Sequence, residues 1–144
     1  MYELETSAAF NAAHFLSDYH GKCENLHGHR WQVTVRIAAE ELGDAGTQRG
    51  MVRDFADFKA AVREEVAALD HSFLVEEGSL RPATVDALEA EGFTLTVLPF
   101  RTTAENLARH LFERLSARGL PVESVECDET PANRAFYRAR RGHS

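Results

Sequence analysis

The sequence predicts an α+β fold, in which a sheet is covered by helices on one face. Segments that alternate apolar and polar residues, as strands do, lie in both halves of the chain. Two other segments repeat apolar residues at spacings of three and four, which is typical of amphipathic helices. The chain has no internal repeat and no low-complexity segment, so we expect residues 1–144 to form one domain.

The first two strands are expected over residues 2–12 and 30–39, and His14 lies just beyond the first of them. The second strand has an apolar residue at every other position, namely Trp31, Val33, Val35 and Ile37. Residues 41–50 contain three glycines and are expected to form a loop.

Two helices have recognisable starts. Asp54 is a suitable N-cap for the first, because its carboxylate can accept a hydrogen bond from the first turn. This helix is expected to bury one apolar stripe, which comprises Phe55, Phe58, Val62, Val66 and Leu69. The second helix is expected to open with a capping box formed by Thr102 and Glu105 and to end at Gly119.

The rest of the chain is expected to add a short helix and three strands. Residues 70–91 are long for a bare connection, and residues 82–90 are expected to form a short helix within them. Alternation predicts further strands over residues 93–98, 122–128 and 133–138.

Composition argues against several classes of partner. The net charge is −7, so we expect no attraction to nucleic acid or to an anionic membrane surface. Basic residues near the C-terminus are weak support for a nucleic-acid site; they are Arg134, Arg138, Arg140 and Arg141. No apolar run approaches the roughly 20 residues that span a bilayer. The N-terminus lacks the features of a signal peptide, so we expect a cytoplasmic protein.

Two cysteines are too few for a disulfide framework, and Cys23 and Cys127 are each expected to be free thiols. Cys127 alternates with Val125 in a predicted strand and is expected to pack as an apolar residue.

The segment Cys23-Glu24-Asn25-Leu26-His27-Gly28-His29 is the main candidate for a functional site. In extended backbone His27 and His29 point the same way, so both imidazoles can reach one cation. With His14 as a third ligand, the set is typical of a catalytic zinc site whose fourth position stays open. Cys23 adds a candidate nucleophile or base. Alternatively, a histidine taken alone is more often a surface or core residue, and Cys23 could close a structural zinc site.

These motifs occur together with others in an order that resembles the family of 6-pyruvoyl-tetrahydropterin and 6-carboxytetrahydropterin synthases. The others are Asp54-Phe55 before the first helix, Leu69-Asp70-His71 after it, Thr103-Ala104-Glu105-Asn106 at the second, and Glu129-Thr130. Each motif is weak alone, but their joint order from His14 to Glu129 is specific.

The resemblance implies a tunnelling fold (T-fold), with a four-stranded antiparallel sheet and two helices packed on one face. It implies that two trimers stack into a homo-hexamer whose active sites lie between subunits. It also implies a Zn²⁺ cofactor held by His14, His27 and His29, and a pterin triphosphate as the small-molecule substrate.

The resemblance also assigns the catalytic groups. Cys23 would abstract a proton as a thiolate, and Asp70 and His71 would move protons on the substrate side chain. The alternative for Cys23 is a structural thiol. The alternative for His71 is a histidine that favours the dipole at the end of a helix.

Pterin binding is assigned to Glu129, Thr103 and Glu105, with the Glu129 carboxylate accepting two hydrogen bonds from the pterin ring. The alternatives are a turn residue for Glu129 and simple helix capping at the start of the second helix. By charge and position alone, Lys22 and Arg53 are candidates to meet the triphosphate.

The spacing Cys-x-x-x-His-Gly-His resembles the 6-carboxytetrahydropterin synthases of queuosine biosynthesis. These enzymes convert 7,8-dihydroneopterin triphosphate to 6-carboxy-5,6,7,8-tetrahydropterin, acetaldehyde and triphosphate. The alternatives are a 6-pyruvoyl-tetrahydropterin synthase, which typically has a longer spacing, and a non-enzymatic zinc-binding relative. One departure from the family pattern is the longer segment 76–100, whose role the sequence leaves open.

Overall fold

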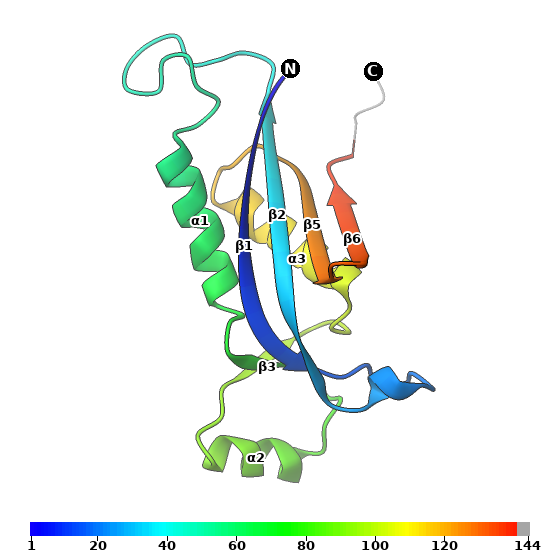
Figure 1. The fold of residues 1–144 in the computed structure, drawn as a ribbon. Helices are drawn as coiled ribbons and strands as arrows, with labels where there is room; N and C mark the ends of the chain where they lie inside the picture. Colours follow the sequence, from blue (N-terminus) through cyan, green and yellow to red (C-terminus); the bar gives the residue numbers. More distant parts are fainter. Residues whose placement is uncertain (141–144) are drawn as a thin grey trace.

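The computed structural model describes residues 1–140, and Arg141 lies outside them. The strands of this part are β1 (Tyr2–His14), β2 (His27–Ala39), β3 (Ser72–Glu76), β4 (Leu95–Leu98), β5 (Val122–Thr130) and β6 (Asn133–Arg138). They form one mixed sheet in the order β4-β3-β1-β2-β5-β6, in which the two long N-terminal strands are central (Figure 1). Its helices are η1 (Lys22–Glu24), α1 (Phe55–Ala67), α2 (Pro82–Ala90) and α3 (Ala104–Ala117).

Two of the helices cover one face of the sheet. Helix α1 contacts β1, helix α3 contacts β5 and β6, and the two helices touch each other. The core between these layers is built from one side of each strand and one stripe of each helix. Its largest buried side chains include Trp31, Phe10, Phe58, Ile37, Leu107 and Leu111. The predicted α+β layering with two helices on one face is therefore confirmed.

The expected four-stranded antiparallel sheet is wrong in its details. Strand β3 pairs in parallel with β1 and with β4, so the described sheet is mixed and has six strands. Parallel neighbours need a crossover connection, and α2 is the crossover between β3 and β4. Segment 76–100 thus contributes α2 and the edge strand β4, which follow β3 at the lower end of Figure 1.

The N-cap of α1 is the predicted residue, and that of α3 differs from the prediction by one residue. The Asp54 side chain accepts a hydrogen bond from the Ala56 N–H at 2.7 Å, as predicted. The N-cap of α3 is Thr103 instead of Thr102, and its hydroxyl accepts from the Asn106 N–H at 3.2 Å. The predicted capping box is therefore wrong by one residue. Phe55 is 54% exposed and does not belong to the buried stripe of α1.

Three strand ends extend beyond their predicted limits, and each extension carries a candidate site residue. Strand β1 continues through His14, β2 begins at His27, and β5 includes Glu129. Glu129 is therefore a strand residue, and it lies where the pairing of β5 with β6 shifts register between Asp128 and Thr130.

The two cysteines are as the sequence predicts. Both Cys23 and Cys127 are free, and Cys127 is fully buried. Burial raises the pKa of the Cys127 thiol to about 12, so this residue is inert packing. Among the helices of residues 1–140, none is both long and apolar enough to cross a membrane.

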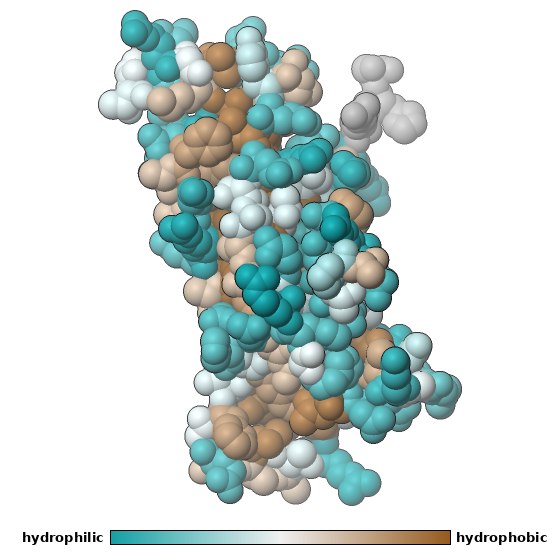
Figure 2. Space-filling model, in the orientation of Figure 1, coloured by the Kyte–Doolittle hydropathy of each residue, from teal (hydrophilic) through white to brown (hydrophobic). Residues whose placement is uncertain are grey.

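Exposed apolar side chains gather at the end of the molecule that carries α2 (Figure 2).

Candidate metal centre

Pairing between β1 and β2 brings the three histidines together. His14 is the cross-strand partner of His27, and Ala12 is the partner of His29. Partners on antiparallel strands project to the same face, and the two-residue period places His29 on that face as well. It is the face covered by helices, where Trp31 continues the row into the core. The positions of all three imidazoles therefore follow from one strand register.

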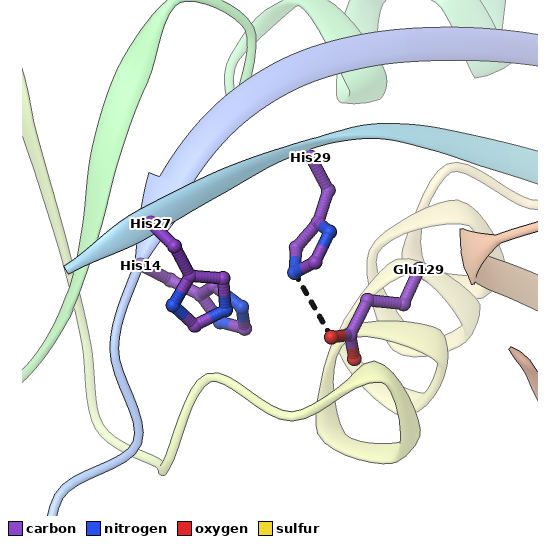
Figure 3. A group of neighbouring side chains, drawn as sticks. All are labelled: His14, His27, His29 and Glu129. Atoms are coloured by element: carbon purple, nitrogen blue, oxygen red, sulfur yellow. Dashed lines mark ion pairs between the residues drawn. The ribbon is translucent and has the colours of Figure 1, made fainter. Parts of the chain in front are cut away.

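The imidazoles form a compact triangle (Figure 3). Their ring centroids lie 4.6 Å apart for His14 and His27, 4.9 Å for His27 and His29, and 5.2 Å for His14 and His29. One ligand atom from each histidine and one from Glu129 all lie within 4.8 Å of one another, so the group could hold a metal ion.

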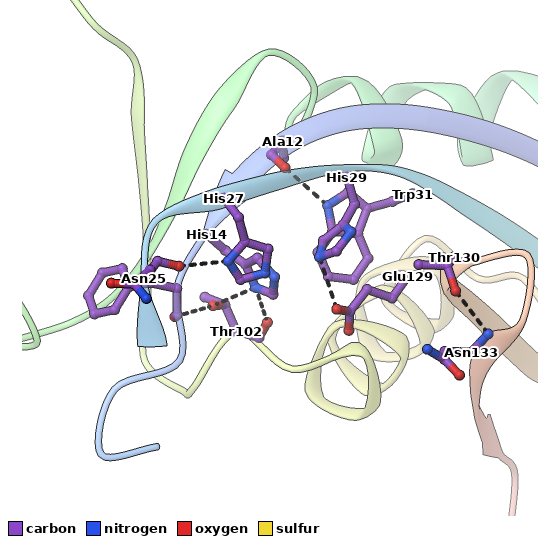
Figure 4. A network of polar contacts seen from close by, with 11 residues as sticks. Ala12, His14, Asn25, His27, His29, Trp31, Thr102, Glu129, Thr130 and Asn133 are labelled. Carbon is purple, nitrogen blue, oxygen red and sulfur yellow. Dashed lines mark hydrogen bonds and ion pairs between the residues drawn. The ribbon is translucent and has the colours of Figure 1, made fainter. Parts of the chain in front are cut away.

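Backbone carbonyl groups orient two of the rings (Figure 4). The Nδ1 atom of His14 lies 2.8 Å from the carbonyl oxygen of Thr102, and that of His27 lies 2.7 Å from the carbonyl oxygen of Asn25. A carbonyl oxygen can only accept, so each Nδ1 carries the proton and donates it. The Nε2 atoms of both rings are left with the lone pair that a metal requires.

All three Nε2 atoms are buried without a hydrogen-bond partner among residues 1–140. Burial lowers the pKa of His14 from 6.5 to about 4, against the opposing effect of its hydrogen bond to Thr102. Burial also lowers the pKa of His29, partly offset by the nearby Glu129 carboxylate. The lowered pKa values favour the neutral rings of His14 and His29 near physiological pH, which is the state that binds metal.

Glu129 reaches the triangle from β5. In that strand Cys127 pairs with Val33 on the helix-covered face, and Glu129 lies two residues further along, just past the last residue that pairs with β2. Its Oε1 atom is 2.9 Å from Nε2 of His29, but the contact lacks hydrogen-bond geometry. A ring nitrogen and a carboxylate oxygen at this distance attract each other only when a proton or a metal ion lies between them.

Three orphaned ring nitrogens beside one carboxylate fit a metal cofactor. Nitrogen and carboxylate oxygen are the donors that zinc accepts, and three histidines leave room for an exchangeable ligand. Metal-binding histidines usually donate their other ring N–H to a carbonyl or carboxylate oxygen, and the Nδ1 atoms of His14 and His27 already donate to carbonyl groups.

Cys23 lies in the one-turn helix η1, just before Asn25 and His27. Its thiol is partly exposed and is not a member of the group of ligand atoms described above. In the described structure Glu129, and not Cys23, is the fourth side chain near the three histidines.

Asp70 and His71 form a well-defined pair just after α1. The Nδ1 atom of His71 lies 2.8 Å from Oδ2 of Asp70, and Oδ1 of Asp70 accepts from the Asn11 N–H at 2.8 Å. The Asn11 N–H, and then His71, lower the pKa of Asp70. His71 has a φ of 52°, a left-handed conformation that is uncommon outside glycine. The imidazole is mostly exposed, so its Nε2 atom is available to a ligand.

This pair does not join the histidine triangle within one chain. His71 lines a cavity of about 550 Å³ together with Asn11, Ala13, Gly28 and Arg30. These residues of β1 and β2 alternate with those that carry the triangle, so their side chains project from the opposite side of the sheet, although Ala12 and His29 also border the cavity. The structure therefore places the predicted proton-transfer pair and the predicted metal ligands on different faces.

The other predicted contacts are divided between the two ends of α3. Thr103 and Glu105 lie in its first turn, directly after Thr102, whose carbonyl group holds His14. Arg53 instead donates a hydrogen bond from Nη2 to the carbonyl oxygen of Gly119, beyond the far end of this helix. Since a 14-residue helix is about 20 Å long, Arg53 is remote from the triangle.

Sequence reasoning missed the residues that orient the ligands. Thr102 is 1% exposed and holds His14 through both its carbonyl oxygen and its hydroxyl, at 2.8 and 3.2 Å. Asn25 holds His27 in the same way through its carbonyl oxygen. Every residue has a carbonyl group, so no residue type marked these positions in the sequence.

Fold and site together define an α+β protein with a histidine-rich group at one end of its sheet that could hold a metal ion. A sequence model described as 6-pyruvoyl tetrahydropterin synthase matches residues 3–140. Because this match spans almost the whole chain, the chain belongs to the 6-pyruvoyl tetrahydropterin synthase family. The family predicted from the order of the motifs is confirmed.

Two named proteins are similar to this chain over nearly its whole length. The 6-carboxy-5,6,7,8-tetrahydropterin synthase of Haemophilus influenzae is 34% identical over 140 residues, which cover 95% of this chain and 99% of that protein. A protein of the same name from Synechocystis is 33% identical over 139 residues, covering 95% of this chain and 93% of that one.

Solved structures share the fold. An uncharacterized protein from Wolinella succinogenes superposes with a TM-score of 0.80 and 26% identity, covering 96% of this chain and 98% of that one. The 6-pyruvoyl tetrahydropterin synthase of Caenorhabditis elegans superposes with a TM-score of 0.67 and 25% identity, covering 96% of each chain.

Zinc content should show that the histidines bind the metal ion and that Glu129 is not required for this. We expect His27→Ala to weaken zinc binding by about 100-fold or more, because one of three orphaned ring nitrogens is lost. Glu129→Ala should retain zinc, and so should the control His20→Ala, which alters an exposed loop residue. Zinc bound per chain can be measured by elemental analysis after dialysis. Wild-type zinc content in His27→Ala would contradict the proposed ligand set.

The lowered pKa of His14 should make the metal-free protein sensitive to acid. Between pH 6.5 and about 4 the unfolded chain protonates this ring and the folded chain does not. The free energy of unfolding should therefore fall as pH falls through this window, by about 3 kcal/mol for the full shift. Urea unfolding of chelator-treated protein measures the slope, which should be shallower in His14→Gln. Equal slopes in the two proteins would contradict the buried neutral ring.

Proposed function

We propose that this protein is a zinc-dependent 6-carboxy-5,6,7,8-tetrahydropterin synthase. It converts 7,8-dihydroneopterin triphosphate to 6-carboxy-5,6,7,8-tetrahydropterin, acetaldehyde and triphosphate, as a step of queuosine biosynthesis. The observation that carries the proposal is the convergence of three unpartnered Nε2 atoms and a carboxylate. The named relatives and the short cysteine-to-histidine spacing support this product over the 6-pyruvoyl one.

In this proposal His14, His27 and His29 hold the zinc ion. Zinc supplies Lewis-acid chemistry, acidifying carbon-bound protons next to the substrate hydroxyl groups that it coordinates. The carbonyl groups of Thr102 and Asn25 keep two of the rings in the tautomer that the metal needs.

Glu129 fixes the pterin ring. An ionised carboxylate can accept two parallel hydrogen bonds from a ring N–H and an exocyclic amine. Glu129 faces the same space as the three Nε2 atoms, so a pterin bound to it has its side chain next to the metal position. Thr103 and Glu105 in the first turn of α3 are further candidate pterin contacts, near the loop that holds His14.

Proton transfer is assigned to Cys23, Asp70 and His71. Cys23 takes a proton from the substrate as a thiolate, a form that a nearby cation favours. Asp70 holds His71 in the tautomer whose free Nε2 can accept or donate a proton. The anchoring of Asp70 to β1 fixes the position of that nitrogen.

The two faces of the sheet support an assembly in which active sites are shared. Asp70 and His71 open away from the triangle of their own chain, so they would serve a triangle on another chain. A homo-hexamer made of two trimers provides such contacts, since each sheet then meets neighbouring copies. The proposed active site therefore takes its metal ligands from one subunit and its proton-transfer pair from another.

Product analysis tests the reaction directly. The purified zinc-loaded protein is incubated with 7,8-dihydroneopterin triphosphate, and the products are identified by mass spectrometry. Formation of 6-carboxy-5,6,7,8-tetrahydropterin and acetaldehyde is expected. Accumulation of 6-pyruvoyl-tetrahydropterin would assign the sister reaction, and unchanged substrate would favour a non-enzymatic zinc-binding relative.

Mixing two inactive variants tests the shared site. Cys23→Ala and His71→Ala should each retain zinc and lose turnover. When the two are unfolded and refolded together, about a quarter of wild-type turnover should return, because random pairing gives some sites both intact groups. The control mixture of Cys23→Ala with His27→Ala should stay inactive, since both defects lie on the same side of the site. Absence of recovery from the first mixture would place the pair in its own chain's site.

A further inference from the structure

The proposed substrate has a highly charged end that the site described so far does not receive. A triphosphate carries several negative charges, while this protein has a net charge of −7. Binding it therefore requires local cationic groups that overcome the general repulsion. Arg53, the arginine favoured by sequence position, is bonded to Gly119 at the far end of α3.

The cavity that contains His71 is a suitable receptor. Its volume of about 550 Å³ is within the range of small-molecule sites, which is about 300 to 1,000 Å³. Polar side chains of Asn11, Arg30 and Thr94 line it together with His71, and Phe73 and Phe93 form apolar walls. Phe93 is 61% exposed and lies in segment 76–100, between α2 and β4.

Arg30 brings a positive charge, without an ion-pair partner in the described chain, to the border between this cavity and a smaller one of about 210 Å³, which Gln32, Asp128 and Arg134 also line. It follows His29 in β2, and strand alternation turns it to the opposite face. No carboxylate within residues 1–140 lies within 4.0 Å of its guanidinium group, whose one hydrogen bond to a side chain is a long one to Gln32, at 3.5 Å. Arg36 on the same strand is paired with Glu5 at 2.9 Å, and Arg134 lies 3.7 Å from both Glu126 and Asp128.

The chemistry of the substrate places its triphosphate close to His71. The proposed role of His71 is to move protons on the short side chain of the pterin, and the triphosphate is attached to the end of that side chain. A substrate in reach of His71 therefore presents its phosphates to the same cavity. A guanidinium group presents several N–H donors in a planar fork that matches phosphate oxygens.

We propose that Arg30, in the cavity of the Asp70–His71 pair, binds the triphosphate group of the substrate. Arg30 is a binding residue in this assignment and takes no part in proton transfer. The inference rests on the proposed function for the identity of the substrate, but the binding of a polyphosphate at Arg30 can be measured without turnover.

Arg30→Gln and Arg36→Gln form a matched pair for the test. Both remove one positive charge from the same face of β2, but only Arg30 lines the cavity. The probe is inorganic tripolyphosphate, titrated by calorimetry into zinc-loaded protein whose metal content is measured before and after. Arg30→Gln should raise the Kd by about 10- to 100-fold, as expected for loss of a charge-assisted hydrogen bond. Arg36→Gln should change it by less than about twofold.

Steady-state kinetics with 7,8-dihydroneopterin triphosphate give a second readout. Arg30→Gln should raise KM by a similar factor with little change in kcat, which is the sign of lost ground-state binding. Wild-type Kd and KM in Arg30→Gln, with product still formed, would overturn the inference and leave the proposed function intact. Weakened tripolyphosphate binding in Arg30→Gln, in a protein whose wild type forms no product, would overturn the function and support Arg30 as the phosphate ligand.

Discussion

The register of β1 against β2 is the constraint on which the rest of the structure depends. It pairs His14 with His27 and places His29 two positions along the same face, so one alignment of two backbones creates the triangle. A slip of one residue would turn one strand's histidines to the opposite face, and it would expose the apolar side chains that follow them. Burial of Trp31 and its neighbours therefore stabilises the register and the ligand geometry at the same time. The site needs no separate stabilisation because it continues the core.

The sheet positions the imidazoles, but carbonyl groups in the adjoining loops determine the tautomers of two of them. Carbonyl groups of Thr102 and Asn25 accept hydrogen bonds from Nδ1 of His14 and His27, and the Nε2 atoms of these two rings and of His29 have no hydrogen-bond partner among residues 1–140. Buried unpartnered polar atoms cost free energy in a folded protein. At the triangle a metal ion would remove that cost, and burial keeps the His14 ring neutral in the absence of the ion.

The parts of the fold that were predictable are those with a periodic pattern. Long strands and the stripes of α1 and α3 could be read from residue spacing, and His27 and His29 could be read from the two-residue period of a strand. Strand β3 could not be predicted, because its five residues include three consecutive apolar ones, Phe73 to Val75, and show no alternation. The start of α3 was displaced by one residue because two adjacent threonines can both cap. The roles of Thr102 and Asn25 depend on backbone atoms, which the sequence does not distinguish.

Strand β1 carries parts of both faces. Its residue His14 belongs to the triangle, while the backbone of Asn11, three positions earlier, accepts from the His71 N–H at 2.7 Å and donates to Asp70 at 2.8 Å. In a shared-site assembly this strand therefore connects two active sites, one on each side of the sheet. A distortion of β1 displaces groups in both of them. Substitutions at the C-terminal end of β1, from Asn11 to His14, are therefore expected to disturb both sites at once.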